Sequence, residues 1–531
     1  MISRGKVLAR LGLLGLGALV YAASFPGFVS TWGLWPLAYL SLVPVFFLTR
    51  RVGPAASILY GAFYGLLSYA LFNFWLAKFH PLALIIVPTI YMVYLAAAFP
   101  LLALVGRLRS RFVYLFQALI WVAYEYLKTL GFLGYPYGII GYSQYLDLPL
   151  VGLASLTGVW GVSLVVALPS ALIAQALDRS GAKPIETFAR LRFDFAALAG
   201  LVLLAHLYGH FSSVDASLGR EWKVSLVQHN VDPWHGGLRA YRQSLDKLMR
   251  LSEDALRDDP DIVIWSETAF VPGIDWHTRY REDPDTFALV DELKRFLKSK
   301  PVPFLFGNDD GRLGKDRGGK PARIDYNAVV LFEGERLVDT YRKIRLVPFT
   351  ENFPFERELP MIYRWLKEAD THFWEAGSEY TVFESKGVRF STPICYEDTF
   401  GELSRNFTRA GAQVIVNLTN DSWSNSVPAM IQHMAMAVFR AVENRRPVVR
   451  GTNGGATCII DPNGRIVEFL EPYIDGHLSG TIKVGPAGRT SLYTAWGDWL
   501  AWLALAAAVA SVFFTLLDLK KPHAVDIGPQ V

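Results

Sequence analysis

The sequence predicts a membrane domain of eight transmembrane helices joined to an α/β domain outside the cytoplasm. Apolar stretches long enough to cross a bilayer, which takes about 20 residues, recur through the first two hundred positions and once near the end. The more polar block between them alternates strand-like and helical patterns. With 531 residues, 52% of them hydrophobic and only 19% charged, the chain is too long and too apolar for one soluble domain.

Eight apolar segments are expected to cross the membrane, at residues 7–24, 33–49, 56–77, 83–105, 112–129, 155–177, 194–212 and 494–517. They predict a membrane domain over 1–212, an α/β domain over 213–490, and a last helix with a tail over 491–531. The formal charge of +4 is small for this length and does not suggest a nucleic-acid partner.

Basic residues in the short loops predict the orientation. With eight spans, five basic clusters fall on one side; they begin at Arg4, Arg50, Arg107, Arg179 and Lys520. Positive loops stay in the cytoplasm, so both termini should be cytoplasmic and the α/β domain outside. The first segment could be a cleaved signal peptide, but no convincing small-residue cleavage site follows it.

Charged residues within the predicted spans are few, which argues against a transporter. The clearest are Glu125 and Lys128, which we expect to reach the interface as a helix-end pair. The glycine- and aromatic-rich loop 131–144 that follows could lie in the interface beneath the outer domain, or form an ordinary membrane-belt loop.

The outer block reads as an α/β domain. Helices are expected at 237–257, 286–298, 400–410 and 429–444. Strands are expected at 222–231, 261–265, 302–307, 328–333, 336–341, 380–384, 388–394, 413–418, 448–450, 456–460 and 466–470.

Cys395 follows the strand at 388–394, where a helix is expected to begin. Exposed amides at a helix start favour the thiolate, which is the nucleophilic form of cysteine. A buried structural cysteine is the alternative, because free cysteine is among the most buried residue types. Cys458 is the other cysteine, and a disulfide between the two would silence this nucleophile.

Two further stretches supply the groups that cysteine acyl transfer needs. The stretch 262–270, IVIWSETAF, ends a strand on Glu267, which can act as the base. The stretch 341–354, YRKIRLVPFTENFP, offers Lys343, whose ammonium can stabilise a tetrahedral oxyanion, and Glu351 eight residues later.

Glutamate, lysine and cysteine in this order, each after a strand, resemble the nitrilase superfamily. With the eight predicted spans, nearly the whole chain resembles the bacterial apolipoprotein N-acyltransferase family. The resemblance implies a four-layer α-β-β-α sandwich on the periplasmic side of the inner membrane. It implies transfer of an acyl chain from a phospholipid, commonly phosphatidylethanolamine, through a cysteine thioester to the N-terminal amine of diacylglyceryl-cysteine on a lipoprotein. The catalytic residues would be Glu267, Lys343 and Cys395. No cofactor, metal or nucleic acid is implied, and we expect a monomer.

The resemblance also suggests supporting residues, namely Glu351, Tyr396, Glu397 and Asn327, and substrate contacts, namely Trp234, Trp423, Phe353 and Phe355. Gln432 and His433 resemble a family Gln-His pair on the helix after the acyl pocket. Solvated surface positions remain the alternative for Glu351 and Glu397, and a core position for Trp423. The family's usual Trp-Pro-Glu is Trp-Ser-Glu here, which leaves the glutamate intact.

The segment 353–374 mixes aromatic and charged residues, which suits a lid that dips into the outer leaflet; a folded, buried loop is the alternative. Two rival functions stay open. One is a membrane-tethered nitrilase-like amidase, in which water takes the thioester. The other is a transporter or scaffold whose outer domain has lost activity.

Overall fold

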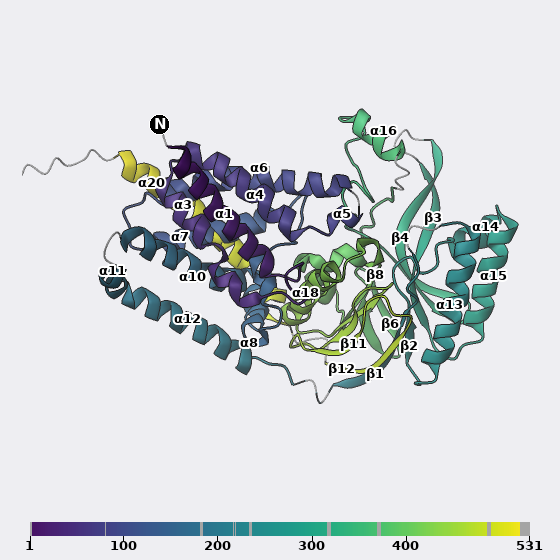
Figure 1. Cartoon of the computed structure of the whole chain (residues 1–531). Helices are drawn as coiled ribbons and strands as arrows, with labels where there is room; N and C mark the ends of the chain where they lie inside the picture. The colour runs from purple at the N-terminus through teal and green to yellow at the C-terminus, as the bar shows by residue number, and fades with distance from the viewer. Residues whose placement is uncertain are drawn as a thin grey trace, which may run out of the picture.

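The structure, a computed structural model, has two parts that lie side by side in Figure 1, with the membrane helices on the left and the sheets on the right. It describes residues 3–79, 81–180, 184–215, 217, 219–232, 236–315, 320–368, 373–485 and 490–520. The chain builds the helical part first, crosses to the sheets, and returns to the helices through its last segment.

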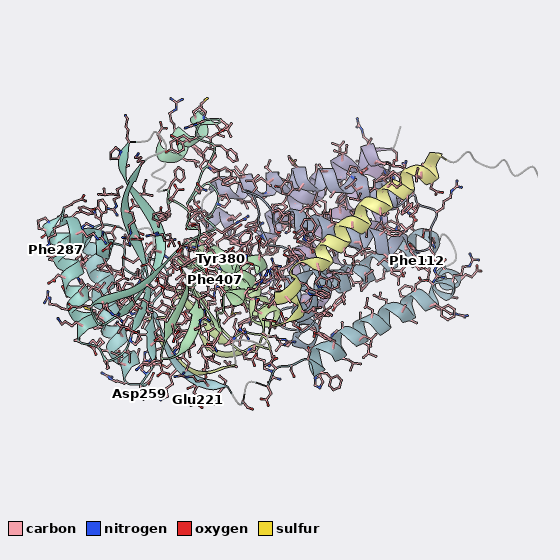
Figure 2. The ribbon with its side chains drawn as sticks, turned by 180° about the vertical axis from the view of Figure 1, so that it is seen from behind. Phe112, Glu221, Asp259, Phe287, Tyr380 and Phe407 are labelled. Atoms are coloured by element: carbon pink, nitrogen blue, oxygen red, sulfur yellow. The ribbon has the colours of Figure 1, made fainter. Side chains whose placement is uncertain are left out.

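All eight predicted membrane segments coincide with helices. Six helices within the described residues are long and apolar enough to cross a membrane: α1 (Arg4–Ala23), α4 (Pro54–Phe72), α6 (Pro81–Val105), α10 (Val159–Ser180), α12 (Arg192–Phe211) and α20 (Trp499–Lys520). The second and fifth segments form shorter helices: α2 (Ala38–Ser41) with α3 (Val43–Arg51), and α7 (Val113–Leu127). Seen from behind, α20 runs across the other membrane helices toward the sheets (Figure 2).

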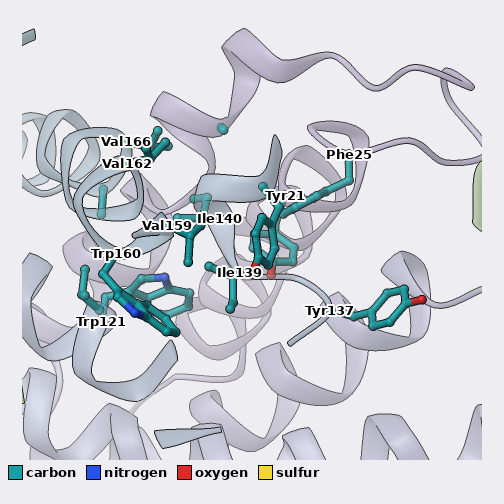
Figure 3. Packing of buried hydrophobic residues seen from close by; sticks show 14 of the residues in the cluster. Tyr21, Phe25, Trp121, Tyr137, Ile139, Ile140, Val159, Trp160, Val162 and Val166 are labelled. Atoms are coloured by element: carbon teal, nitrogen blue, oxygen red, sulfur yellow. The ribbon is translucent and has the colours of Figure 1, made fainter. Parts of the chain in front are cut away.

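Short helices fill the end of the membrane domain nearest the sheets and the remaining connections. They are α5 (Leu76–Phe79), η2 (Ile140–Gln144), α8 (Leu148–Val151), α9 (Ala154–Thr157) and α19 (Leu492–Trp496), with η1 (Trp35–Leu37) and α11 (Pro184–Arg190) elsewhere in the domain. Buried aromatic and branched side chains, Tyr21, Ile139, Val159 and Trp160 among them, pack this region (Figure 3).

Glu125 and Lys128 do not reach the interface; that expectation is wrong. Both are buried, with exposed fractions of 0% and 2%. Lys128 Nζ donates to Tyr69 Oη at 2.7 Å and to the Tyr137 carbonyl at 2.6 Å. Glu125 accepts from the Ile140 N–H at 2.8 Å. Both charges therefore bind the loop 131–144 and hold it against the helices, because a buried charge is stable only with such partners.

The α/β domain contains two six-stranded mixed sheets. The first has the order β12-β1-β2-β3-β4-β5 and comprises β1 (Arg220–Gln228), β2 (Ile262–Ile264), β3 (Phe304–Lys315), β4 (Pro321–Glu333), β5 (Arg336–Arg342) and β12 (Gly476–Val484). The second has the order β11-β10-β9-β8-β7-β6 and comprises β6 (Val382–Ser385), β7 (Val388–Ser391), β8 (Val414–Thr419), β9 (Val448–Thr452), β10 (Thr457–Ile460) and β11 (Ile466–Leu470).

The two sheets pack face to face, with Trp222 of β1 against Phe390 of β7 at 5.3 Å between ring centroids. Helices α13 (Leu238–Leu256), α14 (Ile274–Tyr280) and α15 (Pro284–Lys298) cover the outer face of the first sheet. Helices α17 (Gly401–Arg409) and α18 (Val427–Asn444) cover the second. This is the α-β-β-α sandwich that the resemblance implied.

Helix α18 is the element that the two domains share. It is buried without a break from Ala429 to Asn444. One side covers the second sheet, while Phe439 packs against Tyr142 of the membrane domain at 5.0 Å. Just beyond the helix, Arg445 donates to the hydroxyls of Ser155 and Ser212, both at 2.9 Å. The α/β domain therefore packs directly against the membrane helices.

Close helix packing in the membrane domain generates a test. A Cβ added at Gly65 of α4 would lie 2.3 Å from the Tyr91 carbonyl of α6, whereas one added at Gly12 of α1 would meet nothing within 4 Å. We expect Gly65→Val to destabilise the protein by about 1–3 kcal/mol or more, because the two helices must separate. Thermal unfolding in detergent measures this, with Gly12→Val as the matched control. Equal unfolding temperatures for the two variants would contradict the close α4–α6 contact.

Candidate active site

Cys395 lies four residues beyond the end of β7, as the first residue of the 3-10 helix η3 (Cys395–Thr399). Its φ of 49° is left-handed, a conformation that costs a residue with a side chain about 1–3 kcal/mol and persists only when its surroundings enforce it. Asn417 of β8 supplies part of that support, because its amide donates to the carbonyls of Pro393 at 3.0 Å and Cys395 at 3.3 Å. Cys395 and Cys458 are both buried and free, so no disulfide blocks the thiol.

Glu267 and Lys343 meet as a buried ion pair. Glu267 follows β2 by three residues and Lys343 follows β5 directly, so two strand ends of the first sheet deliver them. Lys343 Nζ lies 3.2 Å from Glu267 Oε1, and the two residues are 1% and 6% exposed. The other carboxylate oxygen of Glu267 accepts the backbone N–H of Asn420 at 3.0 Å, which ties it to the turn after β8.

The charges of Glu267 and Lys343 act on the thiol of Cys395, which brings the three predicted catalytic residues into one site. Burial raises the pKa of the Cys395 thiol, the Glu267 carboxylate raises it further, and the Lys343 ammonium lowers it only in part. The net pKa lies well above its ordinary value. Burial and the Glu267 carboxylate therefore oppose the activation expected from a helix start, so a nearby base is needed to ionise the thiol.

Glu351 and Asn327 complete the surroundings of the lysine. Lys343 Nζ donates to Glu351 Oε1 at 2.7 Å, and the Asn327 amide donates to Glu267 Oε1 at 2.9 Å. Burial by itself lowers the pKa of Lys343, but Glu267 and then Glu351 raise it above its ordinary value overall. The lysine is therefore a fixed ammonium. Glu351 is not a solvated surface acid.

Glu397 binds both of the loops that carry Lys343 and Cys395. Its carboxylate accepts the backbone N–H groups of Ile344, Arg345 and Ile394 at 2.7, 2.9 and 2.7 Å, and the Tyr341 hydroxyl at 2.8 and 2.9 Å. Burial raises its pKa to about 7, while the N–H groups act to lower it. The side chain faces these donors and not solvent, so it connects the lysine loop to the cysteine loop.

Tyr396 turns away from this cluster. Its hydroxyl donates to the Gly134 carbonyl of the membrane domain at 2.6 Å. The guanidinium of Arg345 donates to the Gly131 carbonyl, also at 2.6 Å. The loop 131–144 therefore lies beneath the active site, as one of its two sequence-based interpretations had it.

The predicted substrate contacts fall into two aromatic groups. Trp423, on η4 (Ser422–Ser424), packs against Trp75 and Phe79 of the membrane domain at 5.7 and 4.9 Å, so it lies at the domain junction, partly buried against the hydrophobic core. Phe353 is buried against Phe355, which is 38% exposed and touches Phe132 of the membrane loop at 5.3 Å. Trp234 lies outside the described residues.

Sequence reasoning missed one set of residues next to the thiol. Arg450 of β9 joins Asp398 to Asp421. His433, which the sequence singled out, contacts both of these carboxylates. The sequence did contain a sign of this set, because His433 and Arg450 stand next to apolar residues, and a charged side chain buried there needs a partner of opposite charge.

Two family profiles match the chain. The carbon–nitrogen hydrolase profile matches residues 223–490, and the apolipoprotein N-acyltransferase N-terminal domain profile matches residues 17–172. Apolipoprotein N-acyltransferase 1 of Treponema denticola is 42% identical over 520 residues, 95% of either chain. The chain belongs to the apolipoprotein N-acyltransferase family. The enzyme of the same name from Treponema pallidum is 40% identical over 529 residues, 96% of either chain, and the apolipoprotein N-acyltransferase of Geobacter metallireducens is 29% identical over 520 residues, 94% of either chain.

Membership in this family confirms the resemblance inferred from the motifs. It also confirms the predicted enzyme class, an N-acyltransferase embedded in a membrane with a nitrilase-like α/β domain. The apolar N-terminal helices correspond to the apolipoprotein N-acyltransferase N-terminal domain profile, and the sandwich corresponds to the carbon–nitrogen hydrolase profile.

The contacts of Glu397 with both loops lead to a prediction. In Glu397→Gln one acceptor oxygen becomes an NH2 group that faces buried donors, and each unsatisfied donor costs about 1–3 kcal/mol. Because both catalytic loops should shift, we expect acyl transfer to fall about 100-fold. Tyr341→Phe is the control, because it removes one hydroxyl and keeps all three N–H contacts. Unfolding temperature and kcat are measured for both variants. Equal losses in the two variants would refute the claim that Glu397 holds the two loops through their N–H groups.

Proposed function

We propose that this chain transfers a fatty acyl group from a phospholipid, with phosphatidylethanolamine the expected donor, to the N-terminal amine of diacylglyceryl-cysteine on a lipoprotein. The acyl group travels as a thioester on Cys395, in a ping-pong sequence. The observation that carries the proposal is the convergence of Glu267, Lys343 and Cys395 in one buried site of a chain that belongs to this family.

The first half-reaction forms the thioester. Glu267 accepts the Cys395 proton as the sulfur attacks the ester carbonyl carbon of the donor. The carbonyl oxygen becomes an oxyanion, and the Lys343 ammonium stabilises it. The carbon–oxygen bond of the ester then breaks, and protonated Glu267 returns its proton to the leaving alkoxide. A lysophospholipid departs, and Glu267 is again a carboxylate.

The second half-reaction releases the acyl group. The amine of the lipoprotein attacks the thioester carbonyl, Lys343 stabilises the second oxyanion, and Glu267 takes one proton from the attacking nitrogen. The carbon–sulfur bond breaks, and the thiolate takes that proton back from Glu267. Glu351 and Asn327 support both steps by holding Lys343 and Glu267 in place.

A membrane location suits both lipid substrates. We infer that eight spans carry the chain through a bacterial inner membrane, with both termini cytoplasmic and the catalytic domain periplasmic. The one-sided basic clusters and the helices at all eight predicted positions support this arrangement. We place the domain boundaries at 1–212, 213–490 and 491–531, since β1 starts soon after α12 and α20 follows β12 closely.

Substrate entry is inferred at the domain junction. Trp423, between Trp75 and Phe79, offers an apolar wall for an acyl chain. Helix α16 (Pro360–Glu368) stands away from the sheets at the top of Figure 1 and exposes Met361 and Trp365 by 75% and 44%. That exposure suits a lid whose apolar face enters the outer leaflet. Phe353 and Phe355 would hold its base, and Trp234 is proposed as a further substrate contact from the family resemblance.

The mechanism is tested by intact-protein mass spectrometry after incubation with phosphatidylethanolamine. We expect a fatty-acyl mass increment on the wild type that hydroxylamine removes, and none on Cys395→Ala. A diacylated lipopeptide amine should discharge the adduct much faster than water does. Equal discharge by water would favour the amidase. A folded, lipid-bound wild type that gains no adduct would exclude a cysteine intermediate and favour a transporter or scaffold.

Orientation is tested with single cysteines introduced into a Cys395→Ala, Cys458→Ala background, so that only the introduced thiol reacts with the label. Arg295→Cys lies on the exposed face of α15, and Arg109→Cys lies in the loop between α6 and α7. We expect a membrane-impermeant maleimide to label the first in intact spheroplasts and the second only after lysis. The reverse pattern would invert the proposed topology.

A further inference from the structure

A closed ring of four charged side chains lies behind the active site. His433 of α18 contacts Asp398 of η3 at 2.7 Å through Nε2, and Asp421, two residues beyond β8, at 2.9 Å through Nδ1. Arg450 of β9 donates to the second oxygen of each carboxylate, at 2.6 Å for Asp398 and 2.8 Å for Asp421. No side chain of the four is more than 3% exposed.

The contacts define the charge of every member. Each ring nitrogen of His433 faces a carboxylate oxygen, so both nitrogens donate and the imidazole is a cation. Burial and Arg450 lower the pKa of His433, but Asp398 and Asp421 outweigh them and raise it to about 9. Two cations and two carboxylates then sum to zero. A buried set of charges is tolerated when it balances in this way, and removal of one member leaves an uncompensated charge.

The ring touches the two loops that carry the reaction. Asp398 is the third residue after Cys395, in the same short helix. Arg450 also donates to Asn417 Oδ1 at 2.9 Å, and the amide of Asn417 donates to the Cys395 carbonyl. Asp421 adjoins Asn420, whose N–H donates to Glu267. Cys395 is therefore connected to the ring through Asn417, and Glu267 is connected to it through Asn420.

The neighbouring residue connects the ring to the membrane domain. Gln432 donates to the carbonyls of Pro26 at 2.7 Å and Phe72 at 3.3 Å, and accepts from Trp75 Nε1 at 3.1 Å. Consecutive residues on a helix point in different directions, so Gln432 binds three membrane segments while His433 enters the ring. The membrane domain thus sets the position of His433.

We propose that His433 is a positioning residue for acyl transfer: with Arg450 it neutralises Asp398 and Asp421 and so holds Cys395 and Glu267 in their reactive arrangement. The role rests on the proposed function of Cys395. It assigns a purpose to the Gln-His pair that the catalytic steps do not use. His433 does not touch the reacting atoms; it acts through Asp398 and Asp421.

The electrostatic consequence separates this role from simple stabilisation. The groups that face the thiol are Glu267 after β2, Lys343 after β5 and Asp421 after β8. Those that face His433 are Asp398, Asp421 and Arg450, and the uncharged ring of Tyr137 lies 6.2 Å away. Loss of the His433 cation leaves the ring with one net negative charge beside the thiol. Ionisation of Cys395 then becomes harder, because a thiolate is repelled by that charge.

The test uses the full-length protein in detergent, with His433→Gln. The rate of Cys395 alkylation by iodoacetamide is measured by peptide mass spectrometry at pH 7, where His433 is a cation, beside kcat and KM for acyl transfer. We expect the alkylation rate to fall about 10-fold, because the fraction of thiolate falls when the His433 charge is lost. We expect kcat to fall about 100-fold while KM changes little, because the acyl chain still binds.

Two further variants keep the test decisive if His433→Gln folds poorly. Asp398→Asn added to His433→Gln restores a neutral ring, so its alkylation rate at pH 7 should return toward the wild-type value. Asp421→Asn alone gives the ring one net positive charge at this pH, so its alkylation rate should exceed the wild-type value. The two single variants both remove a buried contact, yet they should change the alkylation rate in opposite directions.

His229→Gln is the matched control. This histidine is also buried and directly follows β1. Its charge interactions are with Lys247 and Asp475, and neither belongs to the ring. Its alkylation rate at pH 7 should equal that of the wild type. Alkylation rates that stay unchanged in the ring variants, or change in the same direction in all of them, would overturn the proposal. Alkylation does not require acyl transfer, so a wild type that gains no acyl group would reject the proposed function while the alkylation rates still decide the role of the ring.

Discussion

The buried ammonium of Lys343 between Glu267 and Glu351 is the interaction on which the site depends. An ion removed from water is stable only with well-placed counter-charges, so both carboxylates must stay close. Those partners come from strand ends of the first sheet and the loop beyond, whereas Cys395 comes from the second. The reactive group therefore forms only when the two sheets are packed. Glu397, which binds backbone N–H groups from both sides, closes that junction.

A second constraint comes from helix α18. The helix carries apolar residues on all of its faces, so every face must be buried. The second sheet covers one side and the membrane domain the other. Its polar residues each find a partner: Gln432 in the membrane domain, His433 in the ring, and Arg440 at the Tyr142 hydroxyl and Glu443. The sandwich is thereby joined to the membrane domain through a helix that both domains bury.

Much of this was predictable from local pattern. The strands before Glu267, Lys343 and Cys395 are short apolar runs, and a charged or nucleophilic residue directly after such a run marks a strand end at a site. Strand β12 was missed because its sequence, GHLSGTIKV, has too few apolar residues; all nine of its residues pair with β1, which supplies what the pattern lacks. The burial of Lys128 was missed because its partners, Tyr69 and Tyr137, belong to other parts of the chain.

The sequence by itself determined the division into apolar helices and an α/β domain, the order of most strands, and the candidate roles of Glu267, Lys343 and Cys395. These follow from hydrophobic period and residue type, which are local properties. The tertiary structure decided the left-handed φ of Cys395, the raised pKa of its thiol and the charge-balanced ring of His433 and Arg450. Each of these depends on burial and on charges brought together from distant segments, and Coulomb interactions between such groups become strong only once folding has removed the water between them.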